Sequence, residues 1–184
     1  MKNIKKVMAM IMIVAVLFSG VVFGEELAQV IITTTVGETV ANSGIRVVES
    51  YTGDSATEFD TAFFSAGSAI TLVSGVDTSL TGDSGEFVVM VRRPTSETTV
   101  KVTVSGTAMA SGTSTIPYKI KGSDDVVYVS YISGEPATAT SYAVTTVVDG
   151  ILRDAKTFTY NIPVSASAPL GTYSATVTFT LTVN

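Results

Sequence analysis

Two groups of charged side chains in this sequence could carry chemistry, and each has a plain structural alternative. Asp77, Asp83 and Glu86 lie around a Gly-Ser loop and could hold Ca²⁺ through carboxylate oxygens, although their spacing fits no EF-hand loop. Arg92 and Arg93 stand just before a proline and could bind a carboxylate or a sulfate. We expect the alternatives instead, namely solvated turn acids and arginines that protect a strand edge from unwanted pairing.

Four tyrosines could form an aromatic patch that contacts sugars: Tyr118, Tyr128, Tyr131 and Tyr142. Tyr128 and Tyr131 differ by three positions, so on an ideal strand their side chains point to opposite faces, and a shared patch needs a bulge between them. We therefore expect these rings to pack in the core or on the sheet surface.

The sequence contains few of the residue types that usually carry out catalysis. The chain contains no His, no Cys and no Trp, so it lacks Ser-His-Asp and Cys-His pairs, imidazole or thiolate metal ligands, and disulfides. Two carboxylates about 5–10 Å apart could cleave a glycoside, but a sequence with 16 acidic residues offers many pairs and distinguishes none. We interpret the acids at 54, 58, 60, 124 and 125 as solvated turn residues too. We predict no enzyme, with no catalytic residue, no cofactor and no metal.

The net charge limits the partners. With 11 basic and 16 acidic residues, the 184-residue chain has a formal net charge of −5. We therefore do not expect a broad nucleic-acid-binding surface. Its hydrophobic and β-branched composition suits one domain with a full core, held together by burial and strand pairing without disulfides.

The N-terminus has the order of a secretory signal peptide. Lys2, Lys5 and Lys6 precede an uncharged run over 7–23, and Val22 and Gly24 fit the −3 and −1 positions of a cleavage site, so the mature chain would begin at 25. Without these three lysines, 8 basic and 16 acidic residues remain, a net charge of −8 over 160 residues. We expect a secreted protein of the periplasm, cell surface or extracellular space, with no membrane insertion after cleavage. The alternative is an uncleaved anchor.

The rest of the chain has the composition and spacing of β-strands. Val, Thr, Ile, Tyr and Phe recur at period two, and turn clusters rich in Gly, Ser, Asp and Asn interrupt them every eight to a dozen residues. No stretch shows a convincing helical period. We predict an all-β fold, an immunoglobulin-like antiparallel β-sandwich preceded by the signal peptide, with strands near 28–36, 45–51, 59–64, 69–73, 86–93, 98–105, 116–121, 125–132, 141–149, 156–164 and 172–183.

The last predicted strand is the clearest. Between 172 and 183 the apolar side chains occupy one face of the strand, and six threonine or serine side chains occupy the other. This pattern indicates one buried face and one solvent-exposed face. A slip of one residue would place the hydroxyl side chains in the core, so the register is firmly set.

The C-terminal segment resembles the end of known secreted β-sandwich subunits. Ile162-Pro163-Val164, followed by Ala168-Pro169-Leu170-Gly171-Thr172-Tyr173 and the alternating strand, is similar to the closing segment of chaperone–usher pilins and of spore coat protein U-like subunits. Gly171 stands fourteenth from the C-terminus, where pilins place a glycine. The resemblance covers about 25 residues of the chain.

This resemblance implies assembly by donor-strand complementation, in which the N-terminal strand of one subunit completes the sandwich of the next. The candidate donor is the segment 27–36, whose inward face would present Ala28, Val30, Ile32 and Val36. The acceptor would be the C-terminal strand, through Gly171, Tyr173, Val177, Phe179, Leu181 and Val183. The alternative is that 28–36 is simply the first strand of its own sandwich.

The sequence therefore predicts three segments: a signal peptide over 1–24, an N-terminal strand with a flexible link over 25–44, and a β-sandwich domain over 45–184. The expected function is a secreted structural subunit of a surface fibre, pilus or coat that assembles by β-strand addition, without catalysis. Its partners would be copies of itself or related envelope subunits. The alternative is a self-contained β-sandwich that acts as a binding or adhesion module of the cell envelope.

Overall fold

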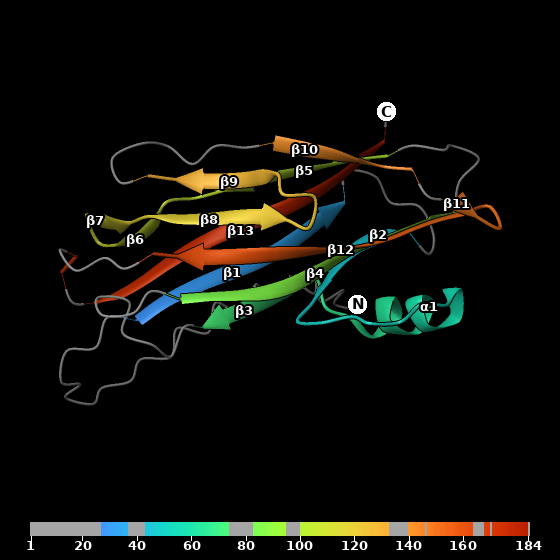
Figure 1. Cartoon of the computed structure of the whole chain (residues 1–184), viewed down its shortest axis with the longest axis horizontal. Helices are drawn as coiled ribbons and strands as arrows, with labels where there is room; N and C mark the ends of the chain where they lie inside the picture. The colour runs from blue at the N-terminus through green and yellow to red at the C-terminus, as the bar shows by residue number, and fades with distance from the viewer. Residues whose placement is uncertain are drawn as a thin grey trace, which may run out of the picture.

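Two β-sheets pack face to face in this chain (Figure 1). The structure is a computed structural model, and it describes residues 27–36, 43–73, 83–94, 100–132, 140–145, 147–163, 168–169 and 171–183. Most of these residues are in strands, and one short helix lies outside the sheets. The prediction of a β-rich sandwich is confirmed in this form.

The first sheet has the strand order β10-β5-β13-β1-β3, with the short β6 and β7 at its side. Its strands are β1 (Leu27–Val36), β3 (Ala69–Val73), β5 (Val100–Gly106), β6 (Met109–Ser111), β7 (Ser114–Ile116), β10 (Thr140–Val144) and β13 (Thr172–Val183). The second sheet has the order β2-β4-β12-β8-β9, with β11 paired to β12. It consists of β2 (Gly44–Val48), β4 (Asp83–Pro94), β8 (Tyr118–Gly122), β9 (Val127–Tyr131), β11 (Val147–Val148) and β12 (Ile151–Ile162).

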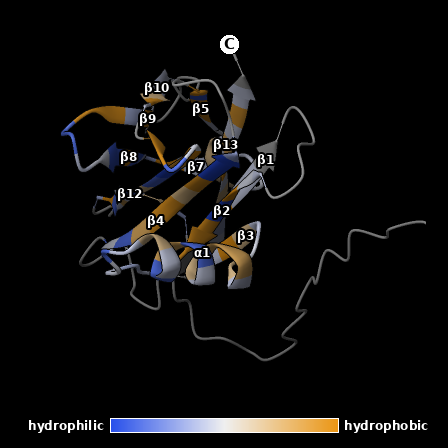
Figure 2. Cartoon of the chain, turned by 90° about the vertical axis from the view of Figure 1, so that its right-hand side faces the viewer, coloured by the Kyte–Doolittle hydropathy of each residue, from blue (hydrophilic) through white to orange (hydrophobic). Residues whose placement is uncertain are grey.

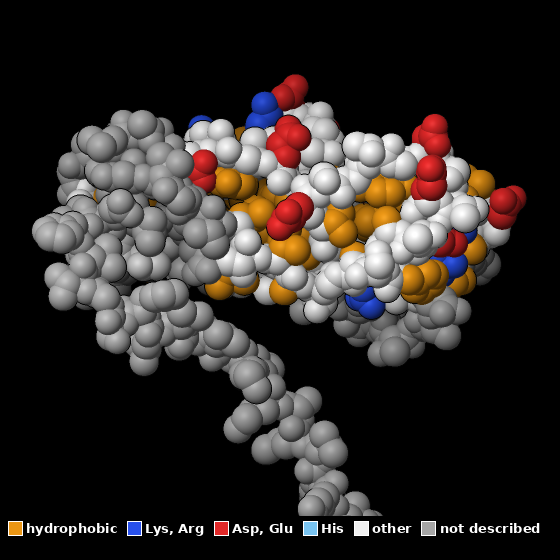
Figure 3. Space-filling model, turned by 90° about the horizontal axis from the view of Figure 1, so that it is seen from below, with side chains coloured by type: hydrophobic (Ala, Val, Ile, Leu, Met, Phe, Trp, Pro, Cys, Tyr) orange, Lys and Arg blue, Asp and Glu red, His pale blue; other side chains and the backbone are white. Residues whose placement is uncertain are grey.

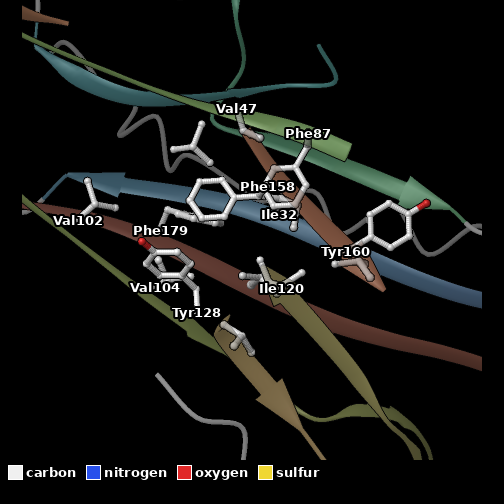
Figure 4. Close-up of a cluster of buried hydrophobic side chains, with 14 of the residues drawn as sticks. Ile32, Val47, Phe87, Val102, Val104, Ile120, Tyr128, Phe158, Tyr160 and Phe179 are labelled. Atoms are coloured by element: carbon white, nitrogen blue, oxygen red, sulfur yellow. The ribbon is translucent and has the colours of Figure 1, made fainter. Parts of the chain in front are cut away.

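The core lies between the inner faces of the two sheets, as the period-two sequences require. At its centre Phe158 of β12 meets Phe87 of β4 at 5.6 Å and Phe179 of β13 at 4.9 Å between ring centroids (Figure 4). The contact with Phe179 is edge-on, a favourable geometry for aromatic rings. The last strand thus packs against the opposite sheet through its predicted apolar face.

A helix replaces one predicted strand. The prediction of a strand at 59–64 is wrong, because residues Ala56–Ser65 form helix α1. Ser55 caps it: the Ser55 hydroxyl accepts from the Glu58 backbone N–H, and the Glu58 side chain accepts from the Ser55 backbone N–H. This reciprocal arrangement satisfies two backbone donors at the helix start and fixes the helix locally.

Helix α1 lies on the outer face of the second sheet, beside β2 and β4 (Figure 2). Phe59 and Phe63, four positions apart, bury their rings against Val88 and Met90 of β4. Because β4 has the core on one face and the helix on the other, its residues from Phe87 to Val91 are buried without alternation. The helix therefore covers sheet surface that would otherwise be exposed.

The sandwich is also not purely antiparallel, which corrects the predicted fold class at one place. Strand β1 pairs with β13 in parallel over its whole length, while the other strand pairs of the described residues are antiparallel. The first and last described strands run the same way, and in this register the buried residues Val30 and Ile32 of β1 lie beside the buried residues Ala175 and Val177 of β13.

Several predicted strands are found close to their predicted places. The strands at 69–73 and 172–183 have the predicted bounds, and the predicted strand at 141–149 is divided into β10 and β11. The strand predicted at 156–164 coincides with the second half of the longer β12 as far as 162. The predicted signal peptide at 1–24 and most of the link over 37–44 lie outside the described residues. In the part of the chain that the structure describes, no helix has the length and apolar character to cross a membrane.

Candidate functional site

The predicted donor strand and the predicted acceptor strand lie next to each other in the same chain. In the parallel register of β1 with β13, Ala28 lies beside Tyr173, and Val30 beside Ala175. Further along the same pair, Ile32 lies beside Val177 and Val36 beside Leu181. The structure therefore brings together the two sets of residues that the sequence singled out for assembly.

Where β1 lies beside β13, a contact called the seam from here on, several inward side chains are buried. Val30 and Ile32 of β1 are fully buried, as are Tyr173, Val177 and Phe179 of β13, and Leu181 is almost so. These side chains belong to the main hydrophobic core rather than to a separate contact. Strand β1 thus supplies part of the core of its own sandwich.

One polar side chain of β1 also faces inward, and it is satisfied there. Thr34 is buried beside Phe179, and its hydroxyl oxygen lies 3.0 Å from the backbone oxygens of both Ile45 and Ser68, either of which can accept its one proton. Its backbone N–H donates to the Ser68 oxygen as well, at 2.8 Å. Because a buried hydroxyl without a partner is costly, these contacts explain how a threonine can occupy the inward row.

The second neighbour of β1 is β3. The two strands are antiparallel, with Val30 beside Leu72 and Ile32 beside Ile70. Strand β1 therefore occupies an interior position of the sheet, with hydrogen-bonded neighbours on both sides. In the isolated chain, the place where a neighbour's strand would be added is filled by the chain's own strand.

Gly171 and Val183 mark the two ends of the seam. Gly171 lies in the bend before β13, where an added Cβ would come within 2.9 Å of the Ser111 hydroxyl oxygen. Val183 pairs with Val100 of β5, on the side of β13 away from β1. A rotation of the Ser111 side chain would relieve this contact, because its Cβ is 3.6 Å away.

The outer face of the seam carries hydroxyl groups. Thr33 of β1 and Thr178 of β13 are direct neighbours, and their hydroxyl oxygens lie 3.0 Å apart. The Thr182 hydroxyl donates to the Lys101 backbone oxygen at 3.2 Å. The predicted division of β13 into an apolar and a hydroxyl face is therefore observed.

The interpretation of Asp60 as a solvated turn acid is wrong, because this residue belongs to helix α1 and forms an ion cluster beneath it. Asp60 of the helix accepts from Arg92 of β4, with Nε at 2.8 Å and Nη2 at 3.4 Å. It also accepts from Arg153 of β12, with Nε at 3.0 Å and Nη2 at 2.9 Å. The hydrogen bonds from Arg153, followed by those from Arg92, hold the pKa of Asp60 well below its usual range. This cluster fastens the helix to two strands of the second sheet.

A second polar cluster surrounds Lys156. Its Nζ donates to Asp124 Oδ2 at 2.6 Å and to the Tyr128 hydroxyl oxygen at 2.7 Å, and it lies 4.4 Å from the centre of the Tyr142 ring. Tyr128 also donates to Asp124 at 2.7 Å. Burial raises the pKa of the Asp124 carboxyl, but the hydrogen bonds from Lys156 and Tyr128 outweigh it and lower the pKa to about 2. Both charges are neutralised within the cluster.

The other candidate residues have structural roles where they are described. Asp83 accepts from the Tyr160 hydroxyl at 3.1 Å, and Asp125 pairs with Lys121 at 2.5 Å. Asp77 lies outside the described residues. Within the described part of the chain, no three His, Cys, Asp or Glu side chains are placed to share a metal ion.

The structure shows the roles of three of the four tyrosines and of one of the two arginines. Tyr118, Tyr128 and Tyr131 are buried in the core, which is the packing role expected of them. A register shift at Ile120/Lys121 supplies the bulge that brings Tyr128 and Tyr131 to one face. Arg92 binds Asp60 instead of protecting an edge.

One concavity of about 330 Å³ lies at the start of α1, between Tyr51, Phe59 and Arg153. Its cation is already engaged, because the Arg153 guanidinium contacts Asp60 and also donates to the Val148 backbone oxygen at 3.3 Å. On the face seen in Figure 3, acidic side chains are spread among hydrophobic ones and basic side chains are few.

The chain matches no protein-family model and no curated protein.

Proposed function

We propose that the chain is a secreted, non-catalytic β-sandwich module of the bacterial cell envelope, closed by its own first strand, with a structural or adhesive role. One observation carries the proposal: β1 lies between β13 and β3 of the same chain, with Val30 and Ile32 in the core. A sandwich that is complete in one chain has no need of a neighbour's strand for folding.

The charged residues support the non-catalytic part of the proposal. The two polar clusters around Asp60 and Lys156 consist of charges that neutralise one another over distances of 2.6–3.4 Å. Such arrangements hold elements together, and neither contains a nucleophile next to a base. An immunoglobulin-like architecture, which the C-terminal resemblance to pilins implies, is part of the same proposal.

Assembly by β-strand addition is the second candidate function. It is favoured by the position of β1, which is the first of the described strands and pairs with β13 and β3. If β1 left its own sheet, the β1 of a second copy could occupy the same place with the same register. Residues Ala28, Val30, Ile32 and Val36 would then complete a neighbour's core instead of their own.

One experiment distinguishes the self-contained module from assembly by strand addition. The exported chain is purified, and its size on an SDS gel is compared with and without boiling, alongside negative-stain microscopy. The self-contained module gives one band of monomer size in both samples and no fibres. A ladder that collapses only on boiling, together with fibres, would contradict the first proposal and support strand exchange.

A further inference from the structure

We propose that the edge strand β9 is a pairing surface for a second copy of this chain, and that two copies associate by antiparallel β9–β9 addition. In the described part of the chain, β9 pairs with β8 alone and ends the second sheet. The inference does not depend on which of the two candidate functions is correct, because β1 takes no part in it.

The exposed hydrophobic side chains point to this edge. Five large hydrophobic residues are exposed in the described structure, and three of them lie on β9 or directly beside it: Val126 at 44%, Val127 at 45% and Ile132 at 61%. Isolated exposed hydrophobic residues are ordinary, but several of them along one strand at the edge of a sheet are typical of an interaction surface.

The sequence of the edge lacks the usual protection. The run from 126 to 132, Val-Val-Tyr-Val-Ser-Tyr-Ile, contains no charge and no proline. Natural edge strands usually carry lysine, proline or an inward-pointing charge, because an apolar, uncharged edge invites another strand to pair with it. The bulge between β8 and β9 is present, but it leaves Val127 and Ile132 exposed.

A shallow groove of about 240 Å³ accompanies the edge. Its lining includes Pro117, Lys119, Val127, Tyr131, Ile132 and Pro163, so that most of it is apolar. Strand addition typically combines backbone hydrogen bonds with small pockets that receive alternate side chains of the added strand. The groove supplies such a pocket beside the open edge.

The occupant that fits is a second copy of the same strand. Val127 and Ile132 stand at opposite ends of the segment, with the more polar Ser130 between them. In a two-fold contact the strands are antiparallel, so the Val127 end of one copy meets the Ile132 end of the other. Both exposed residues then gain an apolar neighbour, no like charges of the strands are opposed, and the antiparallel order β12-β8-β9 continues across the contact.

The test is sedimentation of the purified full chain over a range of concentrations. One short strand per copy forms a small interface, so we expect a reversible dimer with a dissociation constant on the order of 1–100 μM. Val127→Glu places a carboxylate in the proposed contact. Within the monomer this carboxylate lies opposite Lys121 of β8, so the fold tolerates it. The variant should weaken the dimer at least about tenfold. Val148→Glu is the matched control, since Val148 is 48% exposed on β11, away from the edge.

A charge exchange tests the antiparallel arrangement itself. Ile132→Lys alone should also weaken the dimer, whereas the double variant Val127→Glu/Ile132→Lys should regain part of the affinity, because each Glu then faces a Lys of the other copy. Hydrogen exchange of the unmodified chain needs no variant and should show protection of residues 127–132 that increases with concentration.

The proposal is overturned if the unmodified chain stays monomeric at about 500 μM, well above the expected dissociation constant. It is also overturned if Val148→Glu weakens the dimer as much as Val127→Glu. An oligomer that persists in Val127→Glu and survives dilution would point to exchange of β1 instead.

Discussion

Ile32 and Val177 lie side by side in the parallel pairing of β1 with β13, and both side chains are fully buried in the core. One belongs to the first described strand and the other to the last, so this contact joins the two ends of the described chain. The sandwich is therefore closed only when the chain from β1 to β13 is in place.

The first prediction concerns this buried contact. Replacement of Ile32 by Ala removes buried methyl groups and leaves a cavity, so we expect a loss of about 2–5 kcal/mol in the free energy of unfolding. Ile31 points to the half-exposed outer face, and Ile31→Ala is the matched control with an expected loss under about 1 kcal/mol. Urea denaturation measures both, and equal losses would show that β1 is not packed as described.

The second prediction concerns the ion cluster beneath α1. Asp60→Asn removes the charge that neutralises Arg92 and Arg153, and it should cost about 1–3 kcal/mol of stability at neutral pH. Glu49→Gln, at an exposed carboxylate before the helix, should cost nothing measurable.

The pH dependence of the same variant follows from the lowered pKa of Asp60. A lowered pKa means that the charged form stabilises the fold, so this contribution is complete above the unfolded value near 4 and is lost progressively as the pH falls below it. The difference in stability between the unmodified chain and Asp60→Asn should therefore narrow in acid. A difference that widens below about pH 4 would contradict the ion pairing.

The third prediction compares two adjacent acids. Asp124 pairs with Lys156, but its side chain is 40% exposed, so after solvent screening Asp124→Asn should cost only about 0.5–1 kcal/mol. With a folded pKa of about 2, this contribution should disappear between about pH 4 and pH 2. Asp125→Asn, whose carboxylate is largely exposed, should leave the denaturation curve unchanged, and an equal effect of both variants would refute the assignment.

The fourth prediction concerns the start of the helix. Ser55→Ala removes the hydroxyl that accepts from the Glu58 backbone, and loss of such a cap typically costs about 1 kcal/mol. Ser50→Ala, at an exposed position before the helix, serves as the control. Thermal unfolding followed by circular dichroism measures the difference, and a melting temperature of Ser55→Ala equal to that of Ser50→Ala would contradict the capping role.

The sequence allowed the sandwich to be predicted because strand alternation is a local signal. In β13, each apolar residue from Tyr173 to Leu181 is buried and the residues between them are more exposed, as the pattern required. Helix α1 was misassigned because Phe59, Phe63 and Phe64 resemble strand residues in composition. The sequence Ser55-x-x-Glu58 was the available signal, since it is the signature of a capping box.

Other features had no local signal. Asp60 meets arginines that are 32 and 93 positions away, and nothing in the sequence around any of the three marks the others as a partner. The parallel pairing of β1 with β13 was equally hidden, because alternation determines which face of a strand is buried but not which strand lies beside it. Strand order depends on the whole chain.

The most direct test of the central claim is a cysteine cross-link between β1 and β13. The hydroxyl oxygens of Thr33 and Thr178 lie 3.0 Å apart on the outer face, so the double variant Thr33→Cys/Thr178→Cys can form a disulfide there. Because the unmodified chain has no cysteine, every disulfide that forms involves these two positions. After oxidation at low protein concentration, a non-reducing gel should show a single band of monomer size, and mass spectrometry should find the two peptides linked within one chain. Thr33→Cys alone is the control. Disulfide-linked dimers and longer chains from the double variant would contradict the account, because β1 would then lie in the sheet of a neighbour.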